Sequence, residues 1–216
     1  MSDGSREERA RAIMVRTQLE ARGVRDPRVL EAFGRVPRHL FVPEALRDAA
    51  YEDHPVAIGH GQTISQPYTV ALMTELAGPR EGERALDVGT GSGYQAAILA
   101  ELCDTVVAIE VLPALAALAA RRLEALRYDN VTVRVGDAWV GAPEHAPYDV
   151  IIAAAAPAEV PPALLEQLAV GGRLVIPLGV AAQELVLFSR ERGSRLRRET
   201  ITGVRFVPMV GGRPRG

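Results

Sequence analysis

The sequence predicts an α/β fold in which one doubly wound, mostly parallel sheet is preceded by an N-terminal helical extension. Three observations support this class. From residue 84 onward, short apolar runs alternate with helical segments, as in the crossover units of a parallel sheet. A glycine-rich turn joins the first of these runs to the helical segment after it. The chain has 216 residues, of which 48% are hydrophobic, and this suits one domain with one sizeable core.

The N-terminal part of the chain is expected to be mostly helical. Asp26 precedes an apolar segment and has the acceptor side chain typical of a helix N-cap, with Pro27 in the first turn. Gly78 follows another apolar segment and is expected to end its helix. The segments expected to contain helices are 6–22, 26–36, part of 37–53, and 67–78.

Strands and helices alternate in the rest of the chain. The runs "DVIIAAAA" and "RLVIP" are continuously apolar, which suits strands covered on both faces. The last two strands, 183–191 and 197–209, have no helix between them and are expected to pair at least partly antiparallel. Five earlier strands are expected at 84–88, 105–110, 130–135, 148–156 and 172–179, with helices at 94–102, 113–128 and 162–168. We therefore expect a single domain, 1–216, with an N-terminal region (1–80) and an α/β core (81–216).

Composition and charge exclude several classes of protein. The formal net charge of −2 gives no chain-wide attraction to nucleic acid. No apolar run is long enough to span a membrane, and the polar start "MSDGSREERARA" is unlike a secretory signal. Cys103 is the only cysteine, so no internal disulfide can form. We therefore expect a cytoplasmic protein without a nucleic-acid or membrane partner.

The turn "LDVGTGSGY" (86–94) joins the first strand of the core to its first helix. Gly89, Gly91 and Gly93 allow the backbone to turn sharply and to approach a ligand closely. Open α/β sheets bind ligands at such a crossover, so the turn predicts a nucleotide-type cofactor. Because "GSGYQA" also fits the dinucleotide pattern GxGxxA, a nicotinamide or flavin cofactor has to be weighed.

Acidic residues at the ends of three successive strands indicate which cofactor binds. A carboxylate from Asp87 at the mouth of the loop would repel a pyrophosphate and suits a positively charged ligand such as S-adenosylmethionine. Glu110 ends the second strand, where an acid can accept both ribose hydroxyls, although this does not discriminate between the cofactors. Asp137 ends the third strand and is placed to accept the adenine amino group.

The stretch "IGHGQTISQPYTVALM" (58–73) combines turn-forming and polar residues before an apolar run. Ser65 has no histidine and acid pair near it in the sequence, and neither His54 nor His60 has a partner at metal-ligand spacing. We therefore predict no metal site. Two roles stay open for Ser65, a contact to the substrate and the N-cap of the helix at 67–78.

The motifs together resemble a known family. "DVGTGSGYQAA" resembles the first motif of class I S-adenosylmethionine-dependent methyltransferases. "GHGQTISQPYTVALMTEL", "GDAW", "APYDVIIAAAAPAEVPPALLEQLAVGGRLVIPLG" and "VRFVPM" together resemble the protein-L-isoaspartate (D-aspartate) O-methyltransferase family. The likeness runs from about residue 14 to 210, and "GQTISQPY" and "VRFVP" are its most specific parts.

The resemblance implies a repair enzyme with a seven-stranded Rossmann-like methyltransferase sheet. Such enzymes methylate the α-carboxylate of L-isoaspartyl residues in damaged proteins and peptides, using S-adenosyl-L-methionine and releasing S-adenosyl-L-homocysteine. The ester then closes to a succinimide, which hydrolyses in part to normal aspartyl. The resemblance also suggests a monomer.

The resemblance also carries residue roles onto this sequence. Ser65 corresponds to the family's active-site residue, and it is therefore the predicted catalytic residue. The substrate segment carries over onto Gln62, Thr63, Ile64 and Ser65, and the cofactor contacts onto Thr90, Glu110, Asp137 and Ala138. With the glycine turn, the predicted cofactor site consists of Asp87, Gly89, Thr90, Gly91, Gly93, Glu110, Asp137 and Ala138.

The chemistry of this reaction explains why Ser65 needs no partner triad. A carboxylate with a pKa of about 3.5 is already ionised at neutral pH, and the sulfonium already activates the methyl group. The protein therefore has to position the two reactants in line, which is worth several kcal/mol. We expect Ser65 to orient the carboxylate by hydrogen bonding, without a covalent intermediate.

Three positions depart from the family pattern. Ala138 replaces the glycine that commonly follows the aspartate of the third strand, which is acceptable if the local φ suits alanine. Ala154 stands where the family commonly has a threonine, so a hydroxyl near the reaction centre is lost. Val210 stands where some members carry a hydroxyl residue.

Three other functions are weighed against isoaspartyl repair. A peptide-tailoring carboxyl methyltransferase would act on one dedicated substrate, and the departures in the core are compatible with such a change. A non-catalytic module would bind the cofactor and transfer nothing. A nicotinamide dehydrogenase is the weakest rival, because no proton-relay pair is evident near the glycine turn.

Overall fold

The computed structural model describes residues 3–212 of the chain. The α-helices are α1 (Asp3–Met14), α2 (Pro27–Arg35), α3 (Pro67–Ala77), α4 (Tyr94–Ala100), α5 (Pro113–Ala125) and α6 (Pro162–Glu166). The strands are β1 (Val56–Gly59), β2 (Gln62–Ile64), β3 (Arg84–Val88), β4 (Thr105–Glu110), β5 (Val131–Val135), β6 (Tyr148–Ala153), β7 (Leu168–Leu178), β8 (Gln183–Arg190) and β9 (Leu196–Val204).

The predicted doubly wound sheet is confirmed. Seven strands form it in the order β5-β4-β3-β6-β7-β8-β9. The five strands from β5 to β7 run parallel, whereas β8 and β9 add in antiparallel fashion, as expected for two strands without a helix between them. The chain passes from β3 to β4 on one side and later to β6 on the other. This reversal creates the crevice beyond the carboxyl ends of β3 and β4 where open α/β sheets bind ligands.

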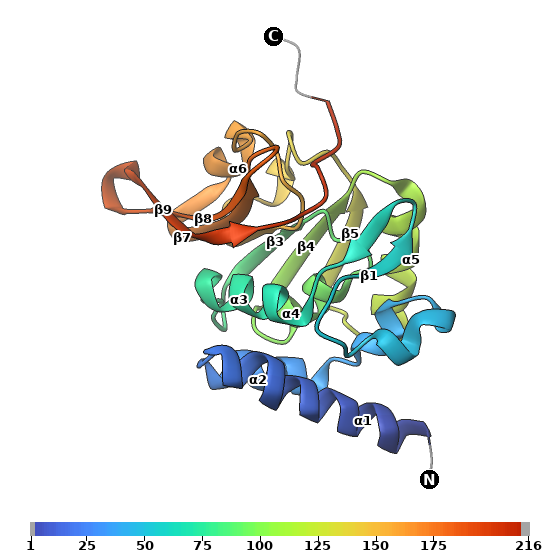
Figure 1. Cartoon of the computed structure of the whole chain (residues 1–216). Coiled ribbons are helices and arrows are strands. Elements are labelled where there is room, and N and C mark those ends of the chain that lie inside the picture. The colour runs from blue at the N-terminus through green and yellow to red at the C-terminus, as the bar shows by residue number, and fades with distance from the viewer. Residues whose placement is uncertain (1–2, 213–216) are drawn as a thin grey trace.

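Each face of the sheet is buried against its own apolar cluster. Alternate residues of a strand separate onto the two faces, so Ala85 belongs to one cluster and Leu86 to the other. The first cluster lies beneath α3 and α4 and extends into the N-terminal helices, which lie together on that side of the sheet (Figure 1). The second cluster includes Leu164 of α6. Burial on both faces explains the continuously apolar strands in the sequence.

The N-terminal helical region packs against α3 and α4, and the helix expected at 6–22 is formed, although only its first part is α-helical. After α1 the chain continues as a π-helical turn, Val15–Leu19, and then as a 3₁₀ turn, Glu20–Arg22. Phe33 of α2 and Phe41 both meet the ring of Tyr94 edge-on, with ring centroids 5.9 and 5.5 Å apart. These contacts join the helical region to the first residue of α4, directly after the glycine turn.

Residues 56–64 form a β-hairpin, an element that the sequence did not predict. β1 and β2 pair antiparallel, and Gly59 lies opposite Gln62, so only two residues make the turn. These two residues, His60 and Gly61, have φ values of +53° and +70°. Positive φ at both positions is the geometry of a type I′ turn, which matches the twist of paired strands. Gly61 therefore holds the turn in a defined conformation.

The N-cap predicted for α2 is confirmed and gives a stability test. The Asp26 carboxylate accepts a hydrogen bond from the backbone N–H of Arg28 at 2.9 Å. Replacing Asp26 with Ala removes this acceptor, and we expect the free energy of unfolding to fall by about 1 kcal/mol. Denaturant unfolding monitored by circular dichroism measures the loss. Asp26→Asn is the control, because asparagine also caps helices, and an equal loss in both variants would contradict the capping role.

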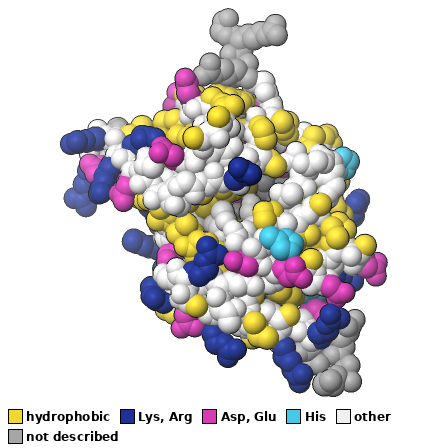
Figure 2. Space-filling view, in the orientation of Figure 1, with side chains coloured by type: hydrophobic (Ala, Val, Ile, Leu, Met, Phe, Trp, Pro, Cys, Tyr) yellow, Lys and Arg dark blue, Asp and Glu magenta, His cyan; other side chains and the backbone are white. Residues whose placement is uncertain are grey.

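The surface carries charges of both signs. Figure 2 shows cationic and anionic side chains interspersed around a hollow near the centre of the face, which agrees with the net charge of −2. Within residues 3–212, no helix combines the length and the apolar character that crossing a membrane requires.

Candidate active site

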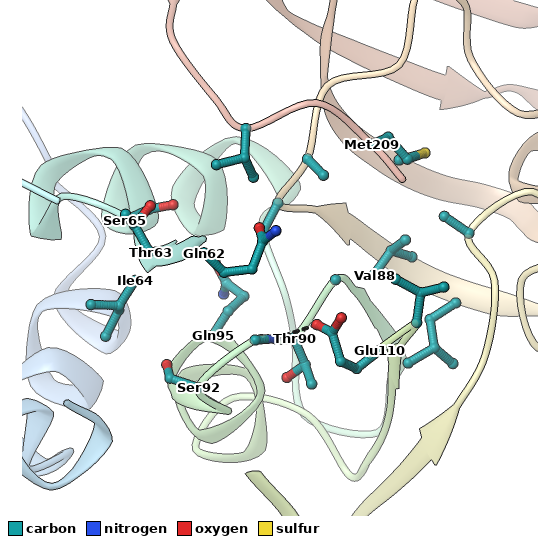
Figure 3. A pocket seen from close by; sticks show the side chains of 18 of the residues that line it. Gln62, Thr63, Ile64, Ser65, Val88, Thr90, Ser92, Gln95, Glu110 and Met209 are labelled. Carbon is teal, nitrogen blue, oxygen red and sulfur yellow. Dashed lines mark hydrogen bonds between the residues drawn. The ribbon is translucent and has the colours of Figure 1, made fainter. Parts of the chain in front are cut away.

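A pocket lies at the carboxyl ends of the central strands, where the sheet topology places a ligand. Val88 of β3 and Ile109 and Glu110 of β4 form its floor with the glycine turn, and segments after β5 and β6 add to it. Figure 3 shows Ser65 and Thr63 on one side of the pocket and Glu110 on the other. The lining residues are Gln62 to Ser65, Val70, Met73, Val88 to Ser92, Tyr94, Gln95, Ile109 to Val111, Gly136, Ala138, Ala154, Ala155 and Val207 to Val210.

The glycine turn adopts a backbone that other residues would strain. Gly89, Gly91 and Gly93 all have positive φ, at +76°, +53° and +90°. A Cβ on Gly93 would lie 3.3 Å from side-chain atoms of Ala119 and Leu123, so this glycine serves the close packing of the turn on α5. Gly89 and Gly91 line the pocket as predicted, whereas Gly93 is not among the lining residues.

Glu110 is a buried acid that organises the glycine turn. One carboxylate oxygen accepts the backbone N–H of Gly91 at 2.9 Å, and the other accepts the N–H of Leu112 at 3.1 Å. The residue is 6% exposed and lines the pocket, and each carboxylate oxygen has a further lone pair beyond the bond described. This is the position expected of an acid that accepts ribose hydroxyls.

Asp87 differs from its expected place at the mouth of the loop. The residue is fully buried in β3 and is not among the pocket-lining residues, so it lies beneath the glycine turn. Neither carboxylate oxygen makes a hydrogen bond of good geometry, and the hydroxyl of Thr90 in the turn above makes none either. Burial raises the pKa of Asp87 to about 7, and the nearby charge of Glu110 adds to this rise, whereas the Thr90 hydroxyl beside the carboxyl group opposes it. Because this carboxyl group does not line the pocket, it acts on a ligand there through its charge and not by direct contact.

Both carboxylate oxygens of Asp137 accept hydrogen bonds from backbone N–H groups. One carboxylate oxygen accepts the N–H of Trp139 at 2.9 Å, and the other accepts the N–H of Gly212 at 2.8 Å. Asp137 itself is not a lining residue, but its neighbours Gly136 and Ala138 are. Positive φ outside glycine occurs, within residues 3–212, only at His60 and Arg127, so alanine at position 138 is unstrained.

Ser65 lies at the junction of two cavities. Together with Thr63, Ala154, Val207 and Pro208, it lines both the pocket and a more open groove beside it. The groove continues between α3, the segment that follows β7, and the end of β9 with the segment after it. Its other lining residues are Arg22, Pro55, Gln66, Tyr68, Thr69, Leu72, Val180 to Gln183 and Ile201 to Phe206.

The structure rules out one of the two roles considered for Ser65. The N-cap of α3 is Gln66, and no side chain makes a capping hydrogen bond there. Capping by Ser65 is therefore wrong, because the helix begins one residue later than that role requires. The backbone carbonyl of Ser65 accepts a hydrogen bond from the Nη2 of Arg38 at 2.7 Å, and this bond holds the backbone at Ser65 in place.

The C-terminal segment was not recognised as part of the pocket from the sequence. Val207 and Met209 form backbone hydrogen bonds of 2.9 Å with Ala156, and the bond from Gly212 to Asp137 ties down the end of the segment. Residues 207–210 thereby close one side of the pocket. The motif "VRFVPM" was the available signal, but a motif does not show where its segment lies in space.

Comparison with known proteins identifies the family. A model of the protein-L-isoaspartate(D-aspartate) O-methyltransferase family matches residues 9–214. The chain belongs to this family. Protein-L-isoaspartate O-methyltransferases are 54% identical over 205 residues in Synechococcus sp. and 55% identical over 199 residues in Methanoregula boonei. The matches cover 91% and 92% of this chain and 84% and 91% of the two relatives.

Solved structures agree with this membership in the protein-L-isoaspartate O-methyltransferase family. One structure of a protein-L-isoaspartate O-methyltransferase has a TM-score of 0.83 and 31% identity, covering 94% of this chain and 66% of its own. A structure from Plasmodium falciparum in complex with S-adenosyl-L-homocysteine has a TM-score of 0.82 and 26% identity, covering 93% and 98%. The predicted fold and the resemblance seen in the sequence are therefore confirmed.

The cofactor of protein-L-isoaspartate O-methyltransferases is S-adenosyl-L-methionine, and the pocket residues suit it. The ligand carries a sulfonium and an ammonium group and has no phosphate, which fits a pocket that has one buried acid, Glu110, in its lining and a second, Asp87, beneath the glycine turn. The lone pairs left on Glu110 are suited to its ribose. The Thr90 hydroxyl lines the pocket without a well-formed hydrogen bond, so it is a polar group that a ligand or water there has to satisfy. When bound, the cofactor supplies an activated methyl group.

Proposed function

We propose that the junction between the pocket and the groove is where this chain methylates the α-carboxylate of an L-isoaspartyl residue in a damaged protein or peptide. The observation that supports this most is the position of Ser65 and Thr63, which line both cavities. The pocket suits the cofactor, and the open groove suits the peptide on either side of the isoaspartyl residue. The two reactants would then meet beside Ser65.

In this proposal, the chain positions the substrate and exchanges no proton with it. The isoaspartyl carboxylate is ionised at neutral pH, so it is a nucleophile without a base. Within the described chain, the lining residues of both cavities include no histidine that would act as one. Gln62 and Ser65 offer an amide and a hydroxyl as hydrogen-bond donors to the carboxylate. Positioning of this kind accelerates reactions by restricting the relative motion of the reactants.

Two cations at the groove would assist substrate binding. Arg22 and Arg205 line the groove, and neither lines the pocket. The guanidinium of Arg22 lies 3.6 Å from the ring centroid of Tyr68 and 3.0 Å from a carboxylate oxygen of Asp53, so its position is defined. These cations favour an anionic peptide group at the groove. The two buried acids, Asp87 and Glu110, lie at the pocket proposed for the cofactor.

Replacing Ser65 with Ala tests the role of its hydroxyl. A hydrogen bond to a charged group is worth about 1.5–3 kcal/mol, so we expect methyl transfer to an isoaspartyl peptide to slow by roughly 10- to 100-fold. The Kd for S-adenosyl-L-homocysteine should stay within about threefold. Transfer is measured with labelled S-adenosyl-L-methionine, and the Kd by isothermal titration calorimetry.

Ser189→Ala is the matched control, because Ser189 of β8 lines neither cavity. Unchanged turnover in Ser65→Ala, or an equal loss in the control, would remove Ser65 from the proposed role. A normal aspartyl twin of the peptide tests the substrate class. Labelling of neither peptide by wild type, with cofactor binding intact, would favour a dedicated peptide substrate or a non-catalytic module.

Cytoplasmic location and the monomeric state remain predictions for this chain. Activity toward D-aspartyl residues is a further possibility raised by the family description. Sedimentation of the purified protein tests the monomeric state, and a D-aspartyl peptide in the same labelling assay tests the substrate range.

A further inference from the structure

Arg38 is a fully buried arginine behind the candidate active site. It begins a short 3₁₀ turn, Arg38–Phe41, and is 0% exposed. Its Nε donates a hydrogen bond to the carbonyl of Ala50 at 2.7 Å, and its Nη2 donates one to the carbonyl of Ser65 at 2.7 Å. Burial lowers the pKa of Arg38 to about 10, so the side chain is still a cation at neutral pH. Burying a cation costs several kcal/mol, and core packing alone does not call for one.

The same guanidinium also contacts the cofactor side of the pocket. Its Cζ lies 4.8 Å from the centroid of the Tyr94 ring. Tyr94 is the first residue of α4, immediately after Gly93 of the glycine turn, and it lines the pocket. A planar guanidinium over an aromatic face is a favourable and directional contact. Arg38 therefore touches the segment that contains Ser65 and the helix that follows the glycine turn.

We propose that Arg38 is a positioning residue that holds the segment Gln62–Ser65 at a fixed place relative to the glycine turn. The proposal rests on the proposed function, in which Ser65 orients the substrate and the glycine turn holds the methyl donor. Arg38 touches neither reactant. It sets the separation of the two segments that do, and a misplacement of about 1 Å between reacting groups can cost roughly 100-fold in rate. A single planar side chain with several donors can satisfy two carbonyls and stack on a ring together, which lysine cannot do.

Arg173 provides a matched control at the other end of α3. Its Nε donates to the carbonyl of Ala77 at 2.7 Å and its Nη2 to the carbonyl of Gly78 at 2.5 Å. It also pairs with Glu83 at 2.8 Å. Arg173 therefore anchors the C-terminal end of the helix whose N-terminal end follows Ser65, and it lines neither cavity.

The test compares Arg38→Lys with Arg173→Lys in the full chain. Both variants lose bonds to backbone carbonyls next to α3, so both are expected to lower Tm. Only Arg38→Lys is expected to lower kcat for an isoaspartyl peptide, by at least tenfold, while the Kd for S-adenosyl-L-homocysteine stays within about threefold. Unchanged kcat in Arg38→Lys, or a similar fall of kcat in Arg173→Lys, would overturn the proposal.

Amide hydrogen exchange gives a second measurement that does not depend on activity. Arg38→Lys should increase exchange in residues 56–66, and Arg173→Lys should increase it near residues 77–83 instead. If the wild type methylates no isoaspartyl peptide, the proposed function fails, and the exchange data still decide the role of Arg38. Unchanged exchange in 56–66 would overturn that role.

Chemical rescue covers the case in which Arg38→Lys does not fold well. In Arg38→Ala, added guanidinium ion at low millimolar concentration is expected to recover part of the lost kcat and to slow exchange in 56–66. Methylammonium, which carries the same charge without the planar set of donors, should recover neither. Equal rescue by both ions would reduce the role of Arg38 to its charge and would contradict positioning.

Discussion

Replacing Glu110 with Ala is expected to weaken cofactor binding by roughly 100-fold. Hydrogen bonds to a charged group are worth about 1.5–3 kcal/mol each, and a loss of about 3 kcal/mol corresponds to this factor. The carboxylate also accepts the N–H groups of Gly91 and Leu112, so its removal loosens the turn that approaches the ligand. Both effects act in the same direction. The Kd for S-adenosyl-L-homocysteine, measured by isothermal titration calorimetry, reports their sum.

Glu101→Ala is the control for the Glu110 variant. Glu101 is a partly buried acid that, like Glu110, has two partners: it accepts the Tyr128 hydroxyl at 3.1 Å and pairs with Arg35 at 2.7 Å. It follows the C-terminal end of α4 and does not line the pocket. We expect Glu101→Ala to lower stability and to leave the Kd within about threefold. A Kd for Glu110→Ala equally close to wild type would show that Glu110 is not a cofactor ligand.

Cofactor affinity is expected to fall as the pH decreases below about 7, because Asp87 must then release a proton on binding. Burial raises the pKa of Asp87 to about 7 in the free protein. A positively charged ligand above it favours the ionised form and lowers this pKa. Binding is therefore coupled to deprotonation, and affinity should drop roughly tenfold per pH unit below about 7 until the pKa of the complex is reached. Calorimetry with S-adenosyl-L-methionine across this range measures the slope.

Asp87→Asn separates this effect from other titrations. Asparagine has nearly the same shape and does not ionise, so the variant should bind more weakly near neutral pH and lose most of the pH dependence between about pH 5 and 7. His54 has a raised pKa because it bonds to the Pro55 carbonyl and to Glu52, but it is exposed and lines neither cavity. Its titration remains in the variant. A slope that persists in Asp87→Asn would assign the pH dependence to another group.

The same variant has an opposite effect on the stability of the free protein. The folded-state pKa of Asp87 lies above its ordinary value of 3.8, so the unfolded chain ionises first as the pH rises. Stability due to this group is therefore full below about pH 4 and is lost as the pH rises to about 7, by up to about 4 kcal/mol. Asp87→Asn should accordingly be more stable than wild type at pH 8 without cofactor. Such a gain would mark Asp87 as a group retained for binding at a cost in stability.

Much of the fold was determined by local sequence patterns. Apolar runs, helical segments between most of them and the closing strand pair predicted all seven strands of the main sheet. The central strands β3, β4 and β6 are largely apolar because they are buried on both faces, whereas β5 and β9 are largely exposed. The missing helix before the last strand predicted its antiparallel pairing, because a parallel connection needs a crossover. The positive φ values at Gly89, Gly91 and Gly93 likewise follow a pattern that the chain carries locally.

Part of the candidate site could also be predicted from the sequence. Glu110 ends a predicted strand next to the glycine turn, and the parallel topology brings the ends of neighbouring strands to one edge. The segment Gln62–Ser65 was recognised through its family resemblance, and the structure brings it to the same pocket. Its hairpin was missed, because strands of three and four residues with a turn of small residues resemble a loop.

The remaining features depend on contacts between segments that are far apart in the chain. The depth of Asp87 is set by the strands and helices that cover it, and no local pattern distinguishes a carboxylate at the mouth of a loop from one beneath it. Arg38 looks like a surface residue in "VPRHLF", yet it is fully buried and contacts Ala50, Ser65 and Tyr94. The sequence by itself thus determined the family, the order of the elements and most ligand-facing segments. Only the tertiary structure decided which charges are buried, because burial is a property of the whole packed chain.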